Sequence, residues 1–216
     1  MPMKLYSHWQ SSASYRVRIA LNLKQVDYLQ TTVDLAPTKS QQHRPEFKAV
    51  NPQGLVPTLV LNNGTVLSQS MAIIEYLEEL VPVPSLLPVE AAARARVRAI
   101  AQIVASDMHP LHTTRVFTYL ANSLDLEPSA IDCWTSHWVT RSLSVIEAML
   151  SDADYCLGTT VTMADIFLVP EVYAARRFGV DLALFPKVRR VDACCSNHEA
   201  FYRAHPSAQP DAPVVA

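Results

Sequence analysis

Serine hydroxyls gather near the N-terminus, in the stretch SSASYRVRIAL that spans residues 11–21. Ser11 and Ser12 stand before a run whose apolar residues recur at helical spacing, which predicts a helix over residues 14–24. The first turn of a helix exposes backbone N–H groups without partners and carries the positive end of the helix dipole. Hydroxyls placed there cap the helix, and the same groups favour a bound anion. The stretch is therefore predicted to hold an anionic group.

The elements that would position this turn follow the order β-α-β-α-β-β-α over residues 1–80. Alternating and β-branched runs predict strands at residues 3–8, 26–35, 55–61 and 65–69. Helical spacing predicts helices at residues 14–24, 41–50 and 71–80, the last of them capped by Ser70. Asn62-Asn63-Gly64 is typical of a hairpin turn between the last two strands. This is the order of a thioredoxin-like α/β domain.

A proline opens the third predicted strand. In a thioredoxin-like domain a cis proline stands at this place and faces the start of the first helix, and Val56-Pro57 fits that position. A proline is also tolerated at the first residue of any strand, where its missing N–H costs little. The proline taken alone leaves both interpretations open.

Beyond residue 80 the pattern becomes helical. Three prolines occur in the eight residues VPVPSLLP, residues 81–88, and predict a linker over residues 81–90. The remainder, residues 91–216, is predicted to be an all-helical domain, with helical patterns at residues 91–108, 110–124, 129–151, 163–178 and 188–205. Thr162 and Asp165 fit a capping box, so Asp165 is interpreted as structural. Pro170 is predicted to kink its helix or to leave one carbonyl unpaired.

Composition and charge argue against several classes of function. Half of the 216 residues are hydrophobic, enough for a core, and the net charge of -2 gives no general attraction to nucleic acid or an anionic membrane. No apolar run has the length of a secretory signal or a membrane span, so a cytoplasmic location is expected. Cys133, Cys156, Cys194 and Cys195 lack CxxC or zinc-type spacing. They are interpreted as reduced thiols, mostly buried or inert, and no metal is expected.

The serine turn lacks the residue that a thioredoxin-like domain usually carries there. A reactive cysteine normally begins the first helix, where the dipole lowers the pKa of its thiol. Residues 11–14 instead read Ser, Ser, Ala, Ser. Without a cysteine the chain cannot exchange disulfides at this turn, yet the anion-stabilising site remains. A thiolate supplied from outside would fit it, and this points to glutathione.

Four motifs carry a resemblance to a known family. SSASYRVRIAL, NPQGLVPTLV, SQSMAIIEYLEE and TMADIFLVPEV resemble the zeta-class glutathione transferases, which include maleylacetoacetate and maleylpyruvate isomerases. The similarity runs over nearly the whole chain, and four separate motifs make it more specific than any one of them. The resemblance implies the glutathione transferase fold, glutathione as cofactor and a homodimer.

The resemblance assigns the thiol site to the serine turn. Ser11 would donate a hydrogen bond to the glutathione sulfur, with Ser12 and the first-turn amides helping to hold the thiolate. A hydroxyl donor favours the charged form and lowers the thiol pKa from about 8.5 toward neutrality. The alternative is that both serines only cap the helix. The glutathione contacts implied by the resemblance are Ser11, Ser12, Gln42, Val56, Pro57, Gln69, Ser70 and His109.

The predicted contacts at Gln69 and Ser70 also have a physical reason. Gln69-Ser70 would hold the γ-glutamyl carboxylate, because an anion at the N-terminus of the helix at residues 71–80 meets free amides. Val56 would pair its backbone with the cysteinyl backbone of glutathione. Each of these residues, and Gln42 with them, has an alternative interpretation as an ordinary cap, strand residue or surface amide.

Cations and donors for a second substrate are expected in the helical domain. Arg177 matches the arginine of the family, and a planar guanidinium suits a carboxylate, although Arg176 and Arg177 would also stabilise a helix end. His109, Thr113 and Arg115 match the cleft segment of the family. The alternatives are a packed histidine and a solvated arginine. The resemblance assigns catalysis to Ser11, Ser12 and Arg177, and second-substrate binding to Gln10, His109, Thr113, Arg115 and Arg177.

Two positions depart from the family pattern. Ala13 replaces a cysteine that is common in the family, and chemistry that depends on that thiol is expected to be lost. Isomerisation uses the thiol of glutathione and is expected to survive. Gln10 stands where relatives often have an arginine, which removes one cation near the second substrate.

Three functions are compatible with this pattern. The leading hypothesis is a glutathione-dependent cis-trans isomerase of maleylacetoacetate- or maleylpyruvate-type substrates in the catabolism of aromatic acids. The alternative is a transferase or dehalogenase that acts on α-halo acids or other small electrophiles. The third is a binding module without turnover. The expected partners are a small-molecule substrate and a second copy of the chain, with neither nucleic acid nor membrane.

Overall fold

The computed structural model describes residues 2–36 and 38–213. Its contacts divide the chain into two compact units. Unit 1 spans Met1–Ser85 and His198–Ala216, and unit 2 spans Leu86–Asn197. The outermost residues of the predicted domain ranges, residue 1 and residues 214–216, lie outside the described residues.

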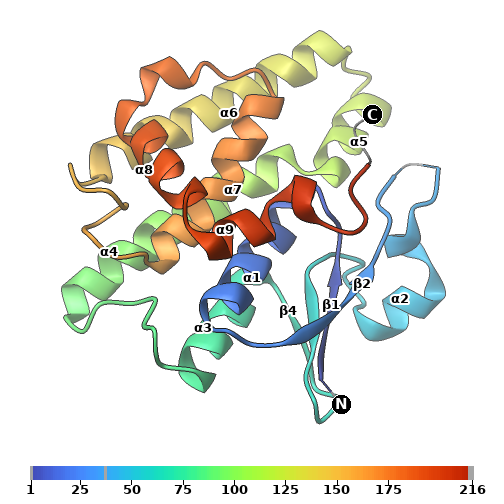
Figure 1. Cartoon of the computed structure of the whole chain (residues 1–216). Helices are drawn as coiled ribbons and strands as arrows, with labels where there is room; N and C mark the ends of the chain where they lie inside the picture. Colours follow the sequence, from blue (N-terminus) through green and yellow to red (C-terminus); the bar gives the residue numbers. More distant parts are fainter. Residues whose placement is uncertain (1, 37, 214–216) are drawn as a thin grey trace. The chain divides into compact units, whose positions relative to one another are not determined.

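Unit 1 contains a four-stranded mixed sheet (Figure 1). The strands, in the order β2-β1-β3-β4, are β1 (Met3–Ser7), β2 (Tyr28–Thr32), β3 (Thr58–Val60) and β4 (Val66–Ser68). β1 runs parallel to β2, since a helix connects them, and antiparallel to β3, which forms a hairpin with β4. The predicted thioredoxin-like order is confirmed, although each strand is shorter than the run that predicted it.

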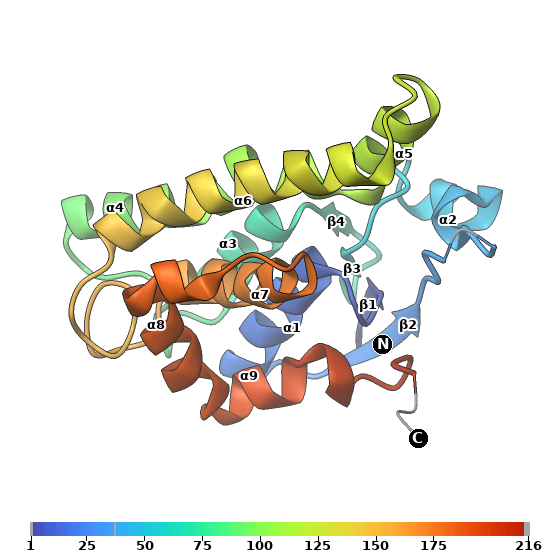
Figure 2. The ribbon, with the colours of Figure 1, turned by 90° about the horizontal axis from the view of Figure 1, so that it is seen from above.

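Helix α1 is the buried centre of unit 1. The helices that follow the strands are α1 (Ser12–Leu23), α2 (Pro45–Val50) and α3 (Ser70–Leu80), with a 3₁₀ turn η1 (Gln41–His43) before α2. Val17, Ile19 and Leu21 are fully buried, because α1 packs against both α3 and the C-terminal helix α9 (Glu199–Ala204). Figures 1 and 2 both show α9 beside α1. Burial of this helix fixes the position of its N-terminal turn.

The C-terminal helical pattern is two helices. α8 (Pro186–Ser196) ends before Asn197, and α9 starts after His198, whose Nδ1 accepts from the Ala200 N–H as an N-cap. The single helix predicted over residues 188–205 is therefore wrong. The side chain of His198 accepts a hydrogen bond from an amide in the first turn of α9. A side-chain cap of this kind marks the start of a new helix, so α8 does not continue into α9.

Among the described residues of unit 1, two X-Pro bonds are cis. Val56-Pro57 is one of them, as predicted for the thioredoxin-like domain, and it directly precedes β3. Val83-Pro84 is the other and lies within the predicted linker.

Unit 2 is helical and is built around α7. Its elements are α4 (Ala91–Gln102), the π-helical segment η2 (Ile103–Met108), the 3₁₀ turn η3 (His109–His112), α5 (Thr114–Asn122), α6 (Pro128–Met149), α7 (Met163–Arg177), the 3₁₀ turn η4 (Leu182–Leu184) and α8. α7 packs against α4 and α8. Most of its residues are buried, and Figure 2 shows its place in the ribbon. The predicted capping box is present: the Thr162 side chain accepts from the Asp165 backbone N–H, and Asp165 Oδ2 accepts from the Thr162 N–H at 2.8 Å. The Thr162 hydroxyl also donates to Asp165 Oδ2 at 2.8 Å.

The two compact units differ from the predicted domain ranges at the C-terminus. Residues after 197 pack with α1, because Arg18 and Asn22 donate to the carbonyls of Ala204 and Ala200. The predicted ranges of 1–80, 81–90 and 91–216 remain a prediction about domains. None of the described helices is both long and apolar enough to cross a membrane.

Candidate active-site residues

The sheet register brings three segments of unit 1 that carry predicted glutathione contacts to one end of the sheet. It aligns the C-terminal end of β1 with the start of β3 and with the end of β4. The turn that carries Ser11 follows β1, Val56-Pro57 precedes β3, and Gln69-Ser70 follows β4. Segments far apart in the sequence are therefore gathered by strand pairing.

Ser11 is the N-cap of α1. Its backbone is extended (φ −69°, ψ 117°), and its Oγ accepts a hydrogen bond from the Ser14 N–H at 3.2 Å. The Ser11 N–H donates to the carbonyl of His8 at 3.1 Å. Capping uses a lone pair of the hydroxyl oxygen, so the hydroxyl proton can still be donated to an anion. The two interpretations of Ser11, cap and thiolate donor, are therefore compatible.

The neighbours of Ser11 leave the helix end suited to an anion. Ser12 opens α1 and is 6% exposed, and the half-buried Gln10 lies in the turn before it. Ala13, the departure from the family pattern, is half-buried in the first turn. That turn contains no acidic residue, so no carboxylate of the helix competes with a bound anion.

Gln69 holds an unusual backbone conformation at the N-cap of α3. Its φ of 71° lies in the region that favours glycine, and such a conformation costs about 1–3 kcal/mol. Its Nε2 donates to Gln53 Oε1 at 3.1 Å. The next residue, Ser70, is buried and accepts from Nη1 of the buried Arg16 at 3.2 Å. A helix N-terminus and a buried guanidinium thus meet at Gln69-Ser70, which favours an anion there.

Gln42 lies in η1, against the segment that leads to Pro57. Its Oε1 is buried and has no hydrogen-bond partner among the described residues. Gly54 (φ +64°) approaches so closely that a Cβ there would lie 2.8 Å from the Gln42 carbonyl oxygen. The segment is held by Asn51, whose Nδ2 donates to the Leu55 carbonyl and the Thr58 hydroxyl, both at 2.9 Å. Gln42 therefore offers a buried acceptor beside a rigid turn.

Unit 2 places His109 in a cluster that sequence reasoning did not identify. Glu171 of α7, only 1% exposed at its side chain, contacts His109 Nδ1 at 3.1 Å through Oε1. Its other oxygen, Oε2, contacts Nε2 of the buried His112 at 2.9 Å. The two imidazole rings meet edge to face, with centroids 5.2 Å apart. Glu171 thus fixes the orientation of both rings.

The same three side chains are of the types that bind zinc. Their donor atoms lie within 4.8 Å of one another. Each carboxylate oxygen already lies close to one imidazole nitrogen, so the buried carboxylate has two ion-pair partners within the protein. The expectation that the chain uses no metal remains a prediction.

The two adjacent arginines at the end of α7 differ in their partners. Arg176 Nη2 forms an ion pair with Asp192 Oδ2 at 2.5 Å. Arg177 is exposed, and its guanidinium carbon lies 5.9 Å from the Tyr173 ring centre and 5.8 Å from that of Phe178. Aromatic rings attract a guanidinium through their π faces. Arg176 is therefore paired with a carboxylate of the protein, whereas Arg177 lies against aromatic rings, and its role towards a substrate remains a prediction.

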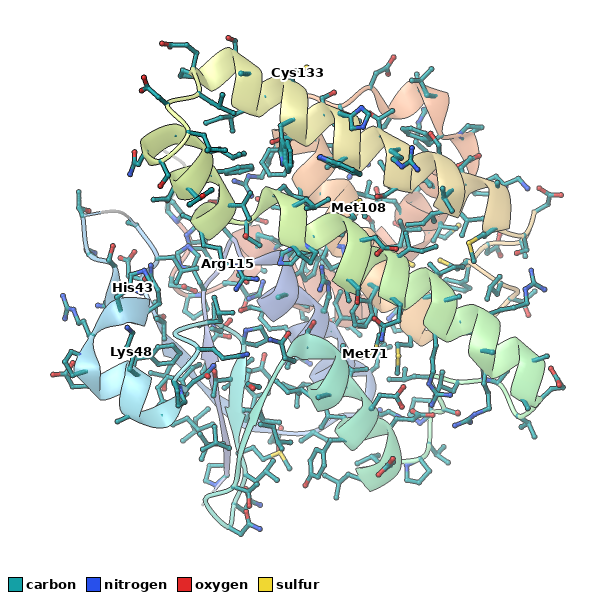
Figure 3. All side chains as sticks on the ribbon, turned by 180° about the vertical axis from the view of Figure 1, so that it is seen from behind. His43, Lys48, Met71, Met108, Arg115 and Cys133 are labelled. Atoms are coloured by element: carbon teal, nitrogen blue, oxygen red, sulfur yellow. The ribbon has the colours of Figure 1, made fainter. Side chains whose placement is uncertain are left out.

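Thr113 and Arg115 lie at the start of α5. Thr113 is its N-cap residue, and its hydroxyl donates to the Pro110 carbonyl at 3.3 Å. Arg115 is exposed in the first turn (Figure 3). Whether either residue contacts a substrate remains a prediction.

The four cysteines differ in accessibility. Cys156 and Cys195 are buried, and burial raises the pKa of both thiols, as does the nearby Asp165. Cys194 is half-buried. Cys133 is exposed on α6 (Figure 3) and is the exception among cysteines that were interpreted as mostly buried or inert.

Comparisons with known proteins match both halves of the chain. Residues 10–80 match the family model described as "Glutathione S-transferase, N-terminal domain", and residues 136–199 match "Glutathione S-transferase, C-terminal domain". A maleylacetoacetate isomerase of Pseudomonas aeruginosa is 44% identical over 99% of this chain and 100% of its own length. A maleylpyruvate isomerase of a Ralstonia species is 47% identical over 97% of this chain and 99% of its own.

A solved structure settles the class. The holo structure of maleyl pyruvate isomerase, described as a bacterial glutathione transferase of the zeta class, is 46% identical with a TM-score of 0.93, over 97% of this chain and 100% of its own. The chain belongs to the zeta class of the glutathione transferases. Another member, a maleylacetoacetate isomerase from Methylobacterium extorquens solved with bound malonate and glutathione, has a TM-score of 0.93 at 40% identity, over 98% of this chain and 100% of its own. The predicted family and fold are thus confirmed.

Sequence reasoning missed the side chains that support this zeta-class site. Asn51 donates to the Leu55 carbonyl, and Glu171 contacts His112. Asp211 accepts from the Trp9 N–H. Asn51 was detectable, since an asparagine before Pro-Gln-Gly is typical of a turn. The sequence carries no signal that links Glu171 to the histidines or Asp211 to the serine turn.

Proposed function

We propose that this zeta-class transferase is a glutathione-dependent cis-trans isomerase of maleylacetoacetate- or maleylpyruvate-type acids, in the catabolism of aromatic acids. The observation that carries the proposal is Ser11, which caps α1 through a lone pair and keeps a hydroxyl proton for a thiolate. The similarity to isomerases over almost the full length supports the same reaction.

The residues of unit 1 fit glutathione. When bound, glutathione supplies a thiolate that adds to the cis double bond, makes it a rotatable single bond, and leaves again once the bond is trans. Ser11 and the amides of the first turn of α1 stabilise the sulfur anion, which lowers its pKa. Gln69, Ser70 and the N-terminus of α3 hold a carboxylate, and the buried Gln42 Oε1 accepts an N–H.

The residues of unit 2 fit an acidic second substrate. Arg177 holds the substrate carboxylate with two parallel N–H donors. His109, oriented by Glu171, offers a further donor, either to that substrate or to a carboxylate of glutathione. Negative charge develops on the substrate oxygen after the thiolate adds, and fixed donors of this kind lower the barrier. Gln10, Thr113 and Arg115 complete the proposed second-substrate set.

Two further properties belong to this proposal. We infer a homodimer and a cytoplasmic location, as the family resemblance implies. Light scattering on the purified chain tests the first, and a mass equal to one chain would contradict it.

The reaction itself is tested with maleylpyruvate and with maleylacetone as substrates. We expect loss of the cis-enol absorbance only when glutathione is present, with a product of unchanged mass. A stable glutathione conjugate, or halide released from an α-halo acid in place of isomerisation, would favour the transferase alternative. No glutathione-dependent change with either substrate would overturn the proposal.

A further inference from the structure

The loop between β1 and α1 has to hold Ser11 where a thiolate can accept its hydrogen bond. This loop, residues 8–11, belongs to no strand or helix of the described chain. Its backbone is bonded from two sides, by Arg18 of α1 and by Asp211 near the C-terminus, all within unit 1. The C-terminal segment therefore contributes directly to the geometry of the loop.

Arg18 binds the carbonyl groups of the loop. Its side chain is fully buried, and it donates to the carbonyls of His8 at 3.2 Å and of Trp9 at 3.0 Å. It also donates to the Ser7 hydroxyl and, through Nε, to the carbonyl of Ala204, both at 3.0 Å. One planar guanidinium thus connects the end of β1, the loop and α9.

Asp211 binds the loop from its N–H side. Its Oδ2 accepts from the Trp9 N–H at 2.9 Å and lies 3.9 Å from Nδ1 of His8. Its Oδ1 accepts from Gln30 Nε2 of the adjacent strand β2 at 3.4 Å. The carboxylate side chain is 10% exposed, so these bonds are shielded from water.

The negative charge of Asp211 favours the protonated form of Arg18. Desolvation lowers the pKa of Arg18 to about 10, and the charges of Tyr28, Asp211 and Tyr15 act in the opposite direction. The guanidinium remains protonated at neutral pH. His8 is the other titratable group of the loop near Asp211.

We propose that Asp211 is a positioning residue for the thiol site: by accepting the Trp9 N–H it holds the loop so that Ser11 meets the sulfur of glutathione. The consequence for catalysis rests on the proposed function, whereas the restraint on the loop does not. A displacement of about 1 Å of a reacting group is enough to slow a reaction substantially. Loss of the Asp211 bond is therefore expected to displace the hydroxyl of Ser11, two residues beyond Trp9, and so to weaken its stabilisation of the thiolate.

The test compares Asp211→Ala with Asp211→Asn in the full-length chain. Amide hydrogen exchange of residues 8–12 measures the loop without any ligand, and it should accelerate in Asp211→Ala only. The ultraviolet absorbance of the bound thiolate, followed against pH, measures the thiol pKa of glutathione. We expect that pKa to rise by about one pH unit in Asp211→Ala, with kcat/KM about tenfold lower. Asp211→Asn keeps an acceptor for the Trp9 N–H and should restore both values.

A matched control is available in unit 2. Asp181 Oδ1 also accepts a backbone N–H, that of Ala183 at 2.9 Å, at the start of η4. Asp181→Ala should leave the loop exchange and the thiol pKa unchanged. If Asp211→Ala fails to fold, Asp211→Glu replaces it, since the longer side chain moves the acceptor while keeping the charge, and it should raise the thiol pKa.

The outcomes separate the inference from the proposed function. Unchanged loop exchange in Asp211→Ala, or an unchanged thiol pKa in a variant whose loop exchange has risen, would overturn the inference. Equal defects in Asp211→Asn and Asp211→Ala would also overturn it, because charge and not the hydrogen bond would then be responsible. A wild-type chain that binds no thiolate would refute the proposed function, and the loop exchange would still decide whether Asp211 restrains the loop.

Discussion

The candidate residues of unit 1 and unit 2 are built in different ways. In unit 1 the groups are backbone amides and small polar side chains, gathered by strand pairing at one end of a sheet. In unit 2 they are long ionisable side chains that orient one another, as Glu171 orients His109 and His112. The position of a backbone amide is fixed by the strands and helices around it, so one side-chain substitution does not remove it. The position of each side chain in a cluster is fixed by the other members, so the loss of one member disturbs the rest. Substitutions within the cluster of Glu171, His109 and His112 should therefore lower the stability of unit 2, whereas substitutions in the unit 1 site should mainly affect catalysis.

The largest effect is expected for Glu171→Ala. It removes the shared acceptor of two imidazoles from a buried position, and loss of one member of such a group costs about 3 kcal/mol in the free energy of unfolding. Urea unfolding measures it. Glu90→Ala, which removes an exposed capping carboxylate from α4 of the same unit, should lower the free energy of unfolding much less, because water replaces the lost hydrogen bonds. An equal decrease in the free energy of unfolding of the two variants would show that Glu171 and its two histidines contribute no more to stability than an exposed helix cap.

Ser11→Ala should affect chemistry more than stability. A hydrogen bond to a charged acceptor contributes about 2 kcal/mol, so kcat/KM should fall by about 30-fold. Ser11→Thr keeps both the hydroxyl and the cap and serves as the control. Ser11→Gly retains most of the capping stability but lacks the donor. A Ser11→Gly variant with wild-type kcat/KM would reduce Ser11 to a cap and weaken the comparison between the units.

Arg177→Lys tests whether the unit 2 arginine acts on the substrate. Lysine keeps the charge but loses the paired donors, so KM for the acidic substrate should rise by about tenfold with little change in stability. Arg176→Lys is the matched control, because Arg176 already pairs with Asp192. Steady-state kinetics distinguishes them. A larger KM effect at Arg176 would reverse the assignment.

The smallest effect is expected from alkylation of Cys133. This thiol is exposed and lies outside both groups of candidate residues, so iodoacetamide should modify it first without loss of isomerase activity. Burial raises the pKa of the Cys156 and Cys195 thiols, so they carry almost no thiolate at neutral pH and should react only on unfolding. Mass spectrometry of the modified chain identifies the order. Early modification of Cys195 would show that unit 2 opens readily.

The sequence by itself predicted most of the local features. The strand and helix order of residues 1–80, the cis Val56-Pro57 bond and the Thr162-Asp165 capping box are confirmed, because each depends on residues close together in the chain, whereas the break between α8 and α9 was not predicted. The serine turn was identifiable for the same reason, since a cap and a first helical turn are contiguous. The missing cysteine then selected an external thiol, and the motifs identified the family.

Only the tertiary structure decided which distant side chains complete these features. Glu171 follows His109 by more than sixty residues, and Asp211 follows Trp9 by about two hundred. No periodicity or motif connects such pairs, because the contact exists only after α7 packs on its neighbours and the C-terminal segment packs on α1. The serine turn was evident as an anion site from its residues alone. The bond that holds its backbone in place depends on a carboxylate near the other end of the chain.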